Sequence, residues 1–224
     1  MPSYFRQVPN FEYVSRLPDS KIGDYAPLKN LFKKGKLRED IFQNLAFFTK
    51  YKIKGNDRPD NVAFEIYQDS TLDWLVLLCN NIVNIQTEWP LPQQQFDDLM
   101  LSKYGNYDTL YGGIHHYETV EVKNSQGVVI VPSGLQVPST YSVSFYDYFA
   151  DKQVDTGNIT IPVTNYEYEE KLENNKRNIF ILKPRYLNVV LDDMEDIMSY
   201  KKGSSQYVRE DLKRADNIKL YSWS

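Results

Sequence analysis

The two histidines, His115 and His116, are the first residues to consider for chemistry, because imidazole binds metal ions and transfers protons near neutral pH. They are adjacent, and adjacent side chains of a strand point to opposite faces, so one metal ion cannot easily bind both. A catalytic metal usually needs three protein ligands, yet the sequence has no third histidine and a single cysteine. We therefore expect structural or hydrogen-bonding roles for both histidines and no bound metal.

Four carboxylates close together form the second candidate site: Asp192, Asp193, Glu195 and Asp196. They fall on the polar side of one predicted helix, whereas helical carboxylate sites usually draw ligands from a second helix, so a solvated face is the better interpretation. Composition does not exclude a Ser–His–Asp hydrolase, but the sequence has no G-x-S-x-G turn and Ser133 falls in an apparent hairpin turn. We find no phosphate-binding loop, dinucleotide fingerprint, zinc spacing or EF-hand. We therefore expect binding rather than catalysis, with no enzyme activity, cofactor or small-molecule substrate.

The composition is that of a packed protein, since 42% of the 224 residues are hydrophobic and 25% are charged. The formal net charge of -4 does not suggest a nucleic-acid partner. The densest basic stretch, residues 33–38, is followed at once by Glu39 and Asp40, as in a solvated loop or helix face. The 18 tyrosines suit surfaces that become buried on assembly, or a β-rich core in which tyrosine replaces phenylalanine. Composition leaves both interpretations open.

Cellular location is constrained by three features. Cys79 lies in an apolar run, so we expect an inert, buried thiol and no disulfide within the chain. The first residues lack the apolar stretch of a signal peptide, and no run approaches the roughly 18 residues of a membrane span. We expect a protein made in a reducing cytoplasm, with no membrane partner.

The start of the chain predicts an extended arm. Residues 1–30 interleave prolines and glycine with aromatic side chains and cannot form a core of their own, so they should pack on the rest of the chain or on a partner. Aromatic anchors dominate many protein interfaces. The candidate partner-contacting residues are therefore Tyr4, Phe5, Phe11 and Tyr13. A short amphipathic helix is expected at residues 40–48.

The next segment predicts the order strand, helix, helix, strand. Residues 51–54 alternate like a short strand, and Pro59 stands near the first position of a helix that reaches Tyr67. Residues 70–73 form a capping box for the second helix, 72–79, which is apolar almost all round and should be buried on both sides. That helix should end at its two terminators and lead into the second strand. The terminators are Asn80 and Asn81, and the strand is residues 82–85.

The second half of the chain predicts a small antiparallel sheet and one strong helix. Short strands are expected at residues 117–123, 128–131, 140–147 and 179–182. Leu187, Val190, Leu191, Met194 and Ile197 repeat at helical spacing, with cations at the end of the helix to complement its negative pole. The fold class is therefore α+β. The expected parts are residues 1–50, arm and short helix; 51–105, the two-helix segment; 106–165, a β-rich insertion; and 166–224, a strand, an amphipathic helix and a tail.

Residues 51–89 resemble the wedge protein 53 family of contractile-tail phage base plates. The resemblance rests on an R-P-D pattern, a tyrosine, a tryptophan before an apolar run, an Asn-Asn pair and a second tryptophan. The residues that carry it are Arg58, Pro59, Tyr67, Trp74, Asn80, Asn81 and Trp89. Residues 113–119 and 165–187 also look like larger members of that family.

The resemblance implies a structural subunit of the virion without known catalysis. It would bind neighbouring wedge proteins, and copies of itself in adjacent wedges, as the base plate assembles in the host bacterial cytoplasm. The resemblance also implies that the two-helix segment is a LysM-like βααβ unit, to which the small sheet, the C-terminal strand and helix, and the extended N-terminal arm are added.

The alternative is a glycan-binding or cell-wall-processing tail protein, because LysM modules elsewhere bind peptidoglycan. The turn between the helices, residues 68–71, lacks the Gly-Asp-Thr context typical of glycan binding. Glycan binding would also need exposed aromatics beside the two helices. The sequence predicts that Trp74 is core and leaves the exposure of Trp89, beside Pro90, open.

Overall fold

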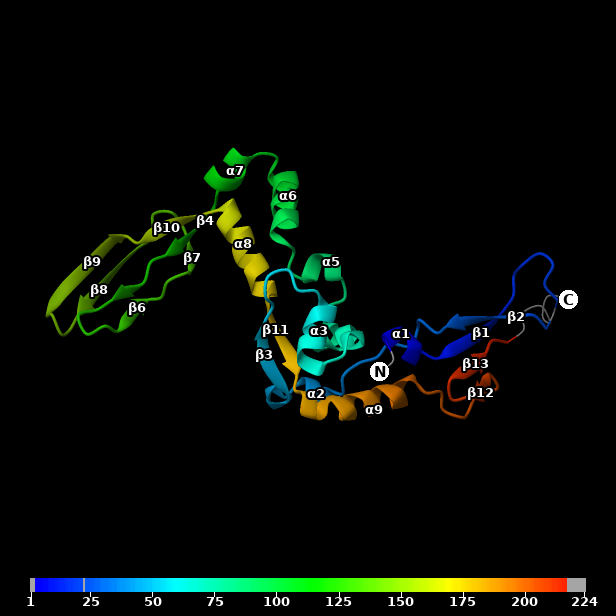
Figure 1. Ribbon diagram of the computed structural model, residues 1–224. Coiled ribbons are helices and arrows are strands. Elements are labelled where there is room, and N and C mark those ends of the chain that lie inside the picture. The colour runs from blue at the N-terminus through cyan, green and yellow to red at the C-terminus, as the bar shows by residue number, and fades with distance from the viewer. Residues whose placement is uncertain (1–2, 22, 217–224) are drawn as a thin grey trace, which may run out of the picture. The chain divides into compact units, whose positions relative to one another are not determined.

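The computed structural model describes residues 3–21 and 23–216, and it confirms a mixed α+β fold with several small sheets (Figure 1). The chain divides into two compact units. Unit 1 contains the residues up to Trp89 and those from Asn178 onward, whereas unit 2 runs from Pro90 to Arg177. Among the described residues, no helix is long and apolar enough to cross a membrane.

The core of unit 1 is a two-stranded antiparallel sheet packed with two helices. Strand β3 (Phe48–Lys52) pairs with β11 (Asn178–Leu182), and Tyr51 lies opposite Ile179. Helices α3 (Pro59–Tyr67) and α4 (Asp73–Cys79) contribute fully buried side chains such as Val62 and Leu75. Burial of these apolar side chains is the main source of stability for the unit.

The expected second strand at residues 82–85 is wrong. Residues 82–84 are not in a strand, and Ile85 begins the short helix α5 (Ile85–Glu88). The physical reason is burial, because Val83 is 75% exposed whereas Ile179, Ile181 and Leu182 of β11 are all buried. The order strand, helix, helix, strand is thus completed by β11, after the whole of unit 2 has been inserted.

The start of the second helix also differs from the expected capping box. Asp69 is the cap, since its Oδ1 accepts a hydrogen bond from the Thr71 N–H at 2.9 Å and begins the 3-10 helix η2 (Ser70–Leu72). Gln68 ends α3 with a left-handed φ of 59°. An Asp cap before a tight turn thus satisfies a free N–H one residue earlier than the predicted Ser70 cap would have done.

The expected extended arm is a folded part of unit 1. Helix α1 (Tyr4–Gln7) leads into a four-stranded sheet of order β12-β13-β1-β2. Strand β1 lies in its interior, parallel to β13 and antiparallel to β2, so the two ends of the chain meet in one sheet (Figure 1). The strands are β1 (Asn10–Val14), β2 (Tyr25–Lys29), β12 (Tyr207–Arg209) and β13 (Leu212–Arg214).

Two more helical predictions have different outcomes. The helix expected at 40–48 is split into α2 (Glu39–Phe42) and the 3-10 helix η1 (Leu45–Phe47), because Asn44 caps the second piece by accepting from the Ala46 N–H. The amphipathic helix is confirmed as α9 (Leu187–Met198), which follows the 3-10 helix η3 (Pro184–Tyr186). Val190, Met194 and Met198 are buried along its inner face.

Unit 2 contains three helices and three small sheets in its described residues. The strand expected at 117–123 is split between β4 (Ile114–Thr119) and β5 (Val122–Lys123), and β5 forms the predicted hairpin with β6 (Val129–Val131). The strand expected at 140–147 is β8 (Ser142–Asp147). Strand β8 pairs with β9 (Lys152–Asn158), and the third sheet has the order β10-β4-β7. The remaining elements are α6 (Gln93–Tyr104), α7 (Tyr107–Gly112), α8 (Asn165–Lys176), β7 (Gln136–Val137) and β10 (Thr160–Thr164).

Candidate partner-binding surface

Asn80 joins helix α4 to strand β11. Its side-chain Nδ2 donates to the Val76 and Phe180 carbonyl oxygens, each at 2.8 Å, and its Oδ1 accepts from the Phe180 N–H at 2.8 Å. The amide therefore pairs with both backbone groups of Phe180, as a neighbouring strand would. Asn81 follows with a left-handed φ of 53°, which lets the chain leave the helix. Both residues of the Asn-Asn pair thus have a structural role.

Tyr67 and Trp89 fasten backbone segments to the same core. The Tyr67 hydroxyl donates to the Leu182 carbonyl oxygen at 2.8 Å, and burial raises the pKa of this tyrosine well above its ordinary value. Trp89 is 5% exposed, and its Nε1–H donates to the Asp57 carbonyl oxygen at 2.9 Å. The exposure of Trp89 that the sequence left open does not occur, because its indole packs in the core and bonds to the turn before α3.

Trp74 lies in the core as expected, with 8% of the residue exposed. Its ring lies 5.9 Å from that of Tyr4, and no acceptor for its Nε1–H occurs among the described residues. The other two motif residues begin α3, where Pro59 is buried in the first turn and Arg58 is exposed and pairs with Asp60 at 3.2 Å. The two motif tryptophans therefore offer no exposed ring on which a sugar could stack.

The two histidines take part in a hydrogen-bonded cluster of unit 2. Their Nδ1 atoms lie 2.9 Å apart, and Nε2 of His116 lies 3.1 Å from Oε1 of Glu118. Lys171 from α8 donates to the same carboxylate oxygen at 2.7 Å, and Tyr168 stacks on His115 with ring centroids 3.8 Å apart. The hydrogen bonds from Lys171 and His116 hold the pKa of Glu118 below its ordinary value. This cluster attaches α8 to β4, which is a structural role.

No group of three or more metal-binding side chains is found in the part of the chain that the structure describes. The four carboxylates expected on a solvated helix face lie on α9 but differ in their surroundings. Asp193 pairs with Arg38 at 3.4 Å, and Asp196 lies 3.7 Å from Lys201. Asp192 and Glu195 instead line a groove of unit 1.

The candidate aromatic anchors near the N-terminus do not share one environment. Tyr4 is partly buried against the core, and its hydroxyl accepts from the Gly35 N–H at 3.0 Å. Phe5 is 64% exposed, with its ring 5.7 Å from that of Tyr4. Phe11 and Tyr13 are half-buried on strand β1, with ring centroids 6.5 Å apart. Of the four, Phe5 offers the largest exposed fraction for a contact with another protein.

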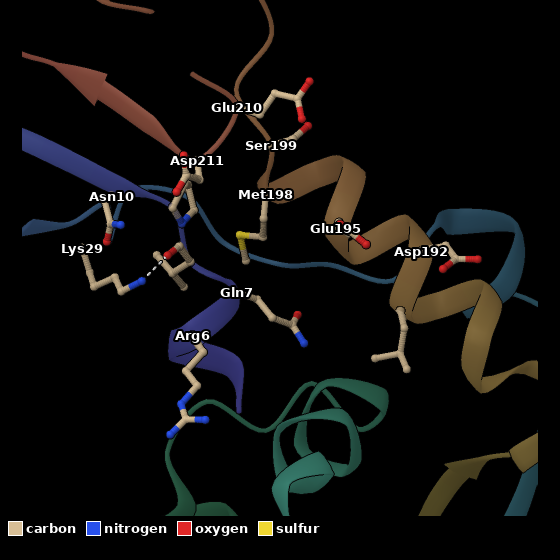
Figure 2. Close-up of a pocket in the computed structure, with 13 residues that line it drawn as sticks. Arg6, Gln7, Asn10, Lys29, Asp192, Glu195, Met198, Ser199, Glu210 and Asp211 are labelled. Carbon is tan, nitrogen blue, oxygen red and sulfur yellow. Dashed lines mark hydrogen bonds between the residues drawn. The ribbon is translucent and has the colours of Figure 1, made fainter. Parts of the chain in front are cut away.

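A groove beside α9, here called the acidic groove, has a volume of about 550 Å³. Residues from the α1–β1 segment, from α9 and from the loop before β13 line it together (Figure 2). The half-buried Leu191 supplies apolar surface to this lining, and the buried Val8 and Met198 also border it. Sequence reasoning missed the groove, because its walls come from both ends of the chain and no single stretch carries a signal for it.

Carboxylates outnumber cations around the acidic groove. Four carboxylates and two cations line it (Figure 2): Asp192, Glu195, Glu210 and Asp211, with Arg6 and Lys29. Lys29 already donates from Nζ to the Val8 carbonyl oxygen at 2.7 Å, and Asp211 already pairs with Arg209 at 2.5 Å. Among the described residues, the other three carboxylates have no ion pair. The groove thus combines apolar surface with unpaired negative charge, which suits binding rather than bond-breaking chemistry.

Comparison with known proteins gives one family. The sequence matches the family described as base plate wedge protein 53 over residues 5–199. Among curated proteins, none matches the chain. The match spans both compact units and all seven motif residues.

Proposed function

We propose that this chain, which belongs to the base plate wedge protein 53 family, binds neighbouring wedge subunits and helps them assemble into the base plate. Membership makes it a structural protein of the phage base plate, and the match over residues 5–199 is the observation that carries the proposal. The partners would be other wedge proteins and copies of this chain in adjacent wedges. Assembly would take place in the host bacterial cytoplasm, at the end of a contractile tail.

The structure supports binding over catalysis as the role of the chain. The side chains best suited to chemistry, His115, His116 and Glu118, are connected to one another and to α8 in one hydrogen-bonded cluster. In contrast, Phe5 and the acidic groove present apolar surface and charge to the outside of unit 1. We therefore propose that the chain is not an enzyme and that this side of unit 1 contacts a partner.

The order β3, α3, α4, β11 supports the proposal that the core of unit 1 is LysM-like. Glycan binding is the weaker proposal for this core. It would need exposed aromatics beside the two helices, and Trp74 and Trp89 are both buried. The motif residues instead fasten the core together, which suits a subunit that must keep its shape while it is held between other proteins.

Co-expression with each candidate wedge protein of the same virion tests the proposal. The full chain should co-elute with at least one of them in size-exclusion chromatography, as a complex of defined stoichiometry. Elution of the chain alone, with every wedge protein tried, would contradict a role in binding neighbouring subunits.

A further inference from the structure

The acidic groove has features of a binding site for one kind of protein segment. Resting on the proposed function, we infer that it binds a segment of a neighbouring wedge protein in which an apolar side chain is flanked by Lys or Arg. The apolar side chain would pack on the half-buried Leu191. The flanking cations would pair with the carboxylates around the groove.

Charge is the first argument for this partner. Asp192, Glu195 and Glu210 line the groove and have no ion pair among the described residues. Of the two lining cations, Lys29 already donates to the Val8 carbonyl oxygen, and Arg6 is exposed. An anionic segment would meet these carboxylates and be repelled, and an uncharged one would leave them unpaired. Complementary charge at an exposed rim favours fast and selective association, and it makes binding sensitive to salt.

Apolar surface is the second argument. Interfaces typically have an apolar centre surrounded by a polar rim, and one anchor residue in a pocket often supplies much of the affinity. The lining of the acidic groove has both parts, because the half-buried Leu191, bordered by the buried Val8 and Met198, lies among residues that carry charge. A purely charged segment would not use this apolar surface, so the partner needs an apolar anchor between its cations.

The walls of the acidic groove are held in place before any partner arrives. Lys33 Nζ donates to the carbonyl oxygens of Ile197 at 2.8 Å and Ser199 at 2.6 Å, which fixes the end of α9. The Asn10 N–H donates to the Asp211 carbonyl oxygen at 2.8 Å, which joins the other wall to strand β1. A site that is already ordered loses less conformational entropy when it binds, so this groove is suited to a short segment.

The first test measures binding of the full chain to each purified wedge protein of the same virion, by calorimetry at low and moderate salt. The groove variant carries D192N, E195Q and E210Q. The control variant carries D98N, D108N and E170Q, which neutralise three exposed carboxylates of unit 2 and change the net charge equally. We expect the groove variant to bind about ten-fold more weakly, with a flatter salt dependence, and the control to bind within about two-fold of the wild type.

The outcomes separate the two proposals. Equal binding by the groove variant and the wild type would overturn the acidic groove as the site while leaving the proposed function intact. Failure of the wild type to bind every wedge protein would contradict the proposed function and the groove together. If the groove variant instead loses self-association and keeps partner binding, the occupant is a second copy of the chain, and the assignment to another wedge protein is wrong.

A second test identifies the chemistry of the segment. Overlapping peptides of about 15 residues, covering the wedge protein that binds, are titrated against the full chain and the groove variant. The expected peptide carries an apolar residue between Lys or Arg, and it binds the wild type more tightly than the groove variant. Binding confined to acidic or uncharged peptides would overturn the inference.

Discussion

The side-chain amide of Asn80 pairs with both the N–H and the carbonyl oxygen of Phe180, a residue 100 positions later in the chain. The two hydrogen bonds, each 2.8 Å, place Asn80 where a third strand would otherwise pair with β11. A family-motif residue thereby joins the parts of unit 1 that precede and follow the insertion of unit 2. The motif residues therefore make contacts that hold the core of unit 1 together.

Asn80→Ala should destabilise unit 1 by about 2 kcal/mol, because the Phe180 backbone groups and the Val76 carbonyl oxygen lose their partner. Urea unfolding followed by intrinsic fluorescence measures the change. Asn81→Ala is a neighbouring control that tests the left-handed backbone instead of the amide. A shift for Asn80→Ala within about 0.5 kcal/mol, the range of ordinary surface sites, would show that the amide does not hold the strand.

Trp74→Ala and Trp89→Ala should each cost about 3–5 kcal/mol, as for other large buried aromatics. The phenylalanine variants should differ. Trp89→Phe also removes the hydrogen bond to the Asp57 carbonyl oxygen, so it should cost about 1 kcal/mol more than Trp74→Phe, whose Nε1–H has no acceptor among the described residues. Thermal or urea unfolding compares the pair. Equal costs would mean that the Trp89 hydrogen bond adds nothing to stability.

Lys33→Ala should lower stability by about 1 kcal/mol, because the ammonium caps the carbonyl oxygens at the negative end of α9. Burial, and then the nearby Lys213 and Lys201, lower the pKa of Lys33, so part of what these hydrogen bonds contribute is offset by the cost of keeping the ammonium charged there. Lys34→Ala, at an exposed neighbouring position, is the matched control. Chemical unfolding of the two variants should separate them, and equal effects would count against the cap.

Acid should loosen the turn between β8 and β9. The buried Asp147 carboxylate accepts from the Ser125 N–H at 2.9 Å, as well as from the Phe149 N–H at 3.1 Å and the Ala150 N–H at 3.2 Å. The Ser125 hydrogen bond and the others lower its pKa in the folded state. The stabilisation is therefore present above the unfolded pKa of about 3.9 and is lost as pH falls through the lower folded value.

Amide exchange of Phe149 and Ala150, corrected for the intrinsic rate at each pH, measures that loss. Protection should fall below about pH 4 in the wild type and change less in Asp147→Asn, which cannot be protonated there. Asp98→Asn is the control, since Asp98 is exposed on α6. The same loss of protection in Asp147→Asn would show that a group other than the Asp147 carboxylate controls the turn.

Elements with a strong local signal could be predicted from the sequence. The periodicity of residues 187–197 predicted α9, and the turn at residues 124–127 predicted the β5–β6 hairpin. Helix α8 was missed because its buried positions include Glu169 and Glu173 instead of apolar residues. Burial alone would raise the pKa of Glu169, but hydrogen bonds from Lys103 and Tyr104 outweigh it and lower that pKa. Such pairing is not visible in a hydrophobic pattern.

Elements that depend on distant partners could not be predicted. Strand β1 pairs with β13, and Asn10 lies opposite Leu212, so neither strand has a partner within its own part of the sequence. The acidic groove was missed for the same reason, since Arg6, Glu195 and Glu210 meet only in the folded unit. The family motif, by contrast, was found from the sequence because its residues lie within one short segment, even though Tyr67 and Asn80 bond to the distant strand β11.

Composition of purified base plates tests the central claim most directly. Base plates isolated from virions, or from cells that make no tail tube, are washed at high salt and analysed by quantitative mass spectrometry against labelled standards. If the chain is a wedge subunit, it should be present at a fixed ratio to the other wedge proteins. Absence of the chain from intact, washed base plates, or a variable trace amount, would contradict the account.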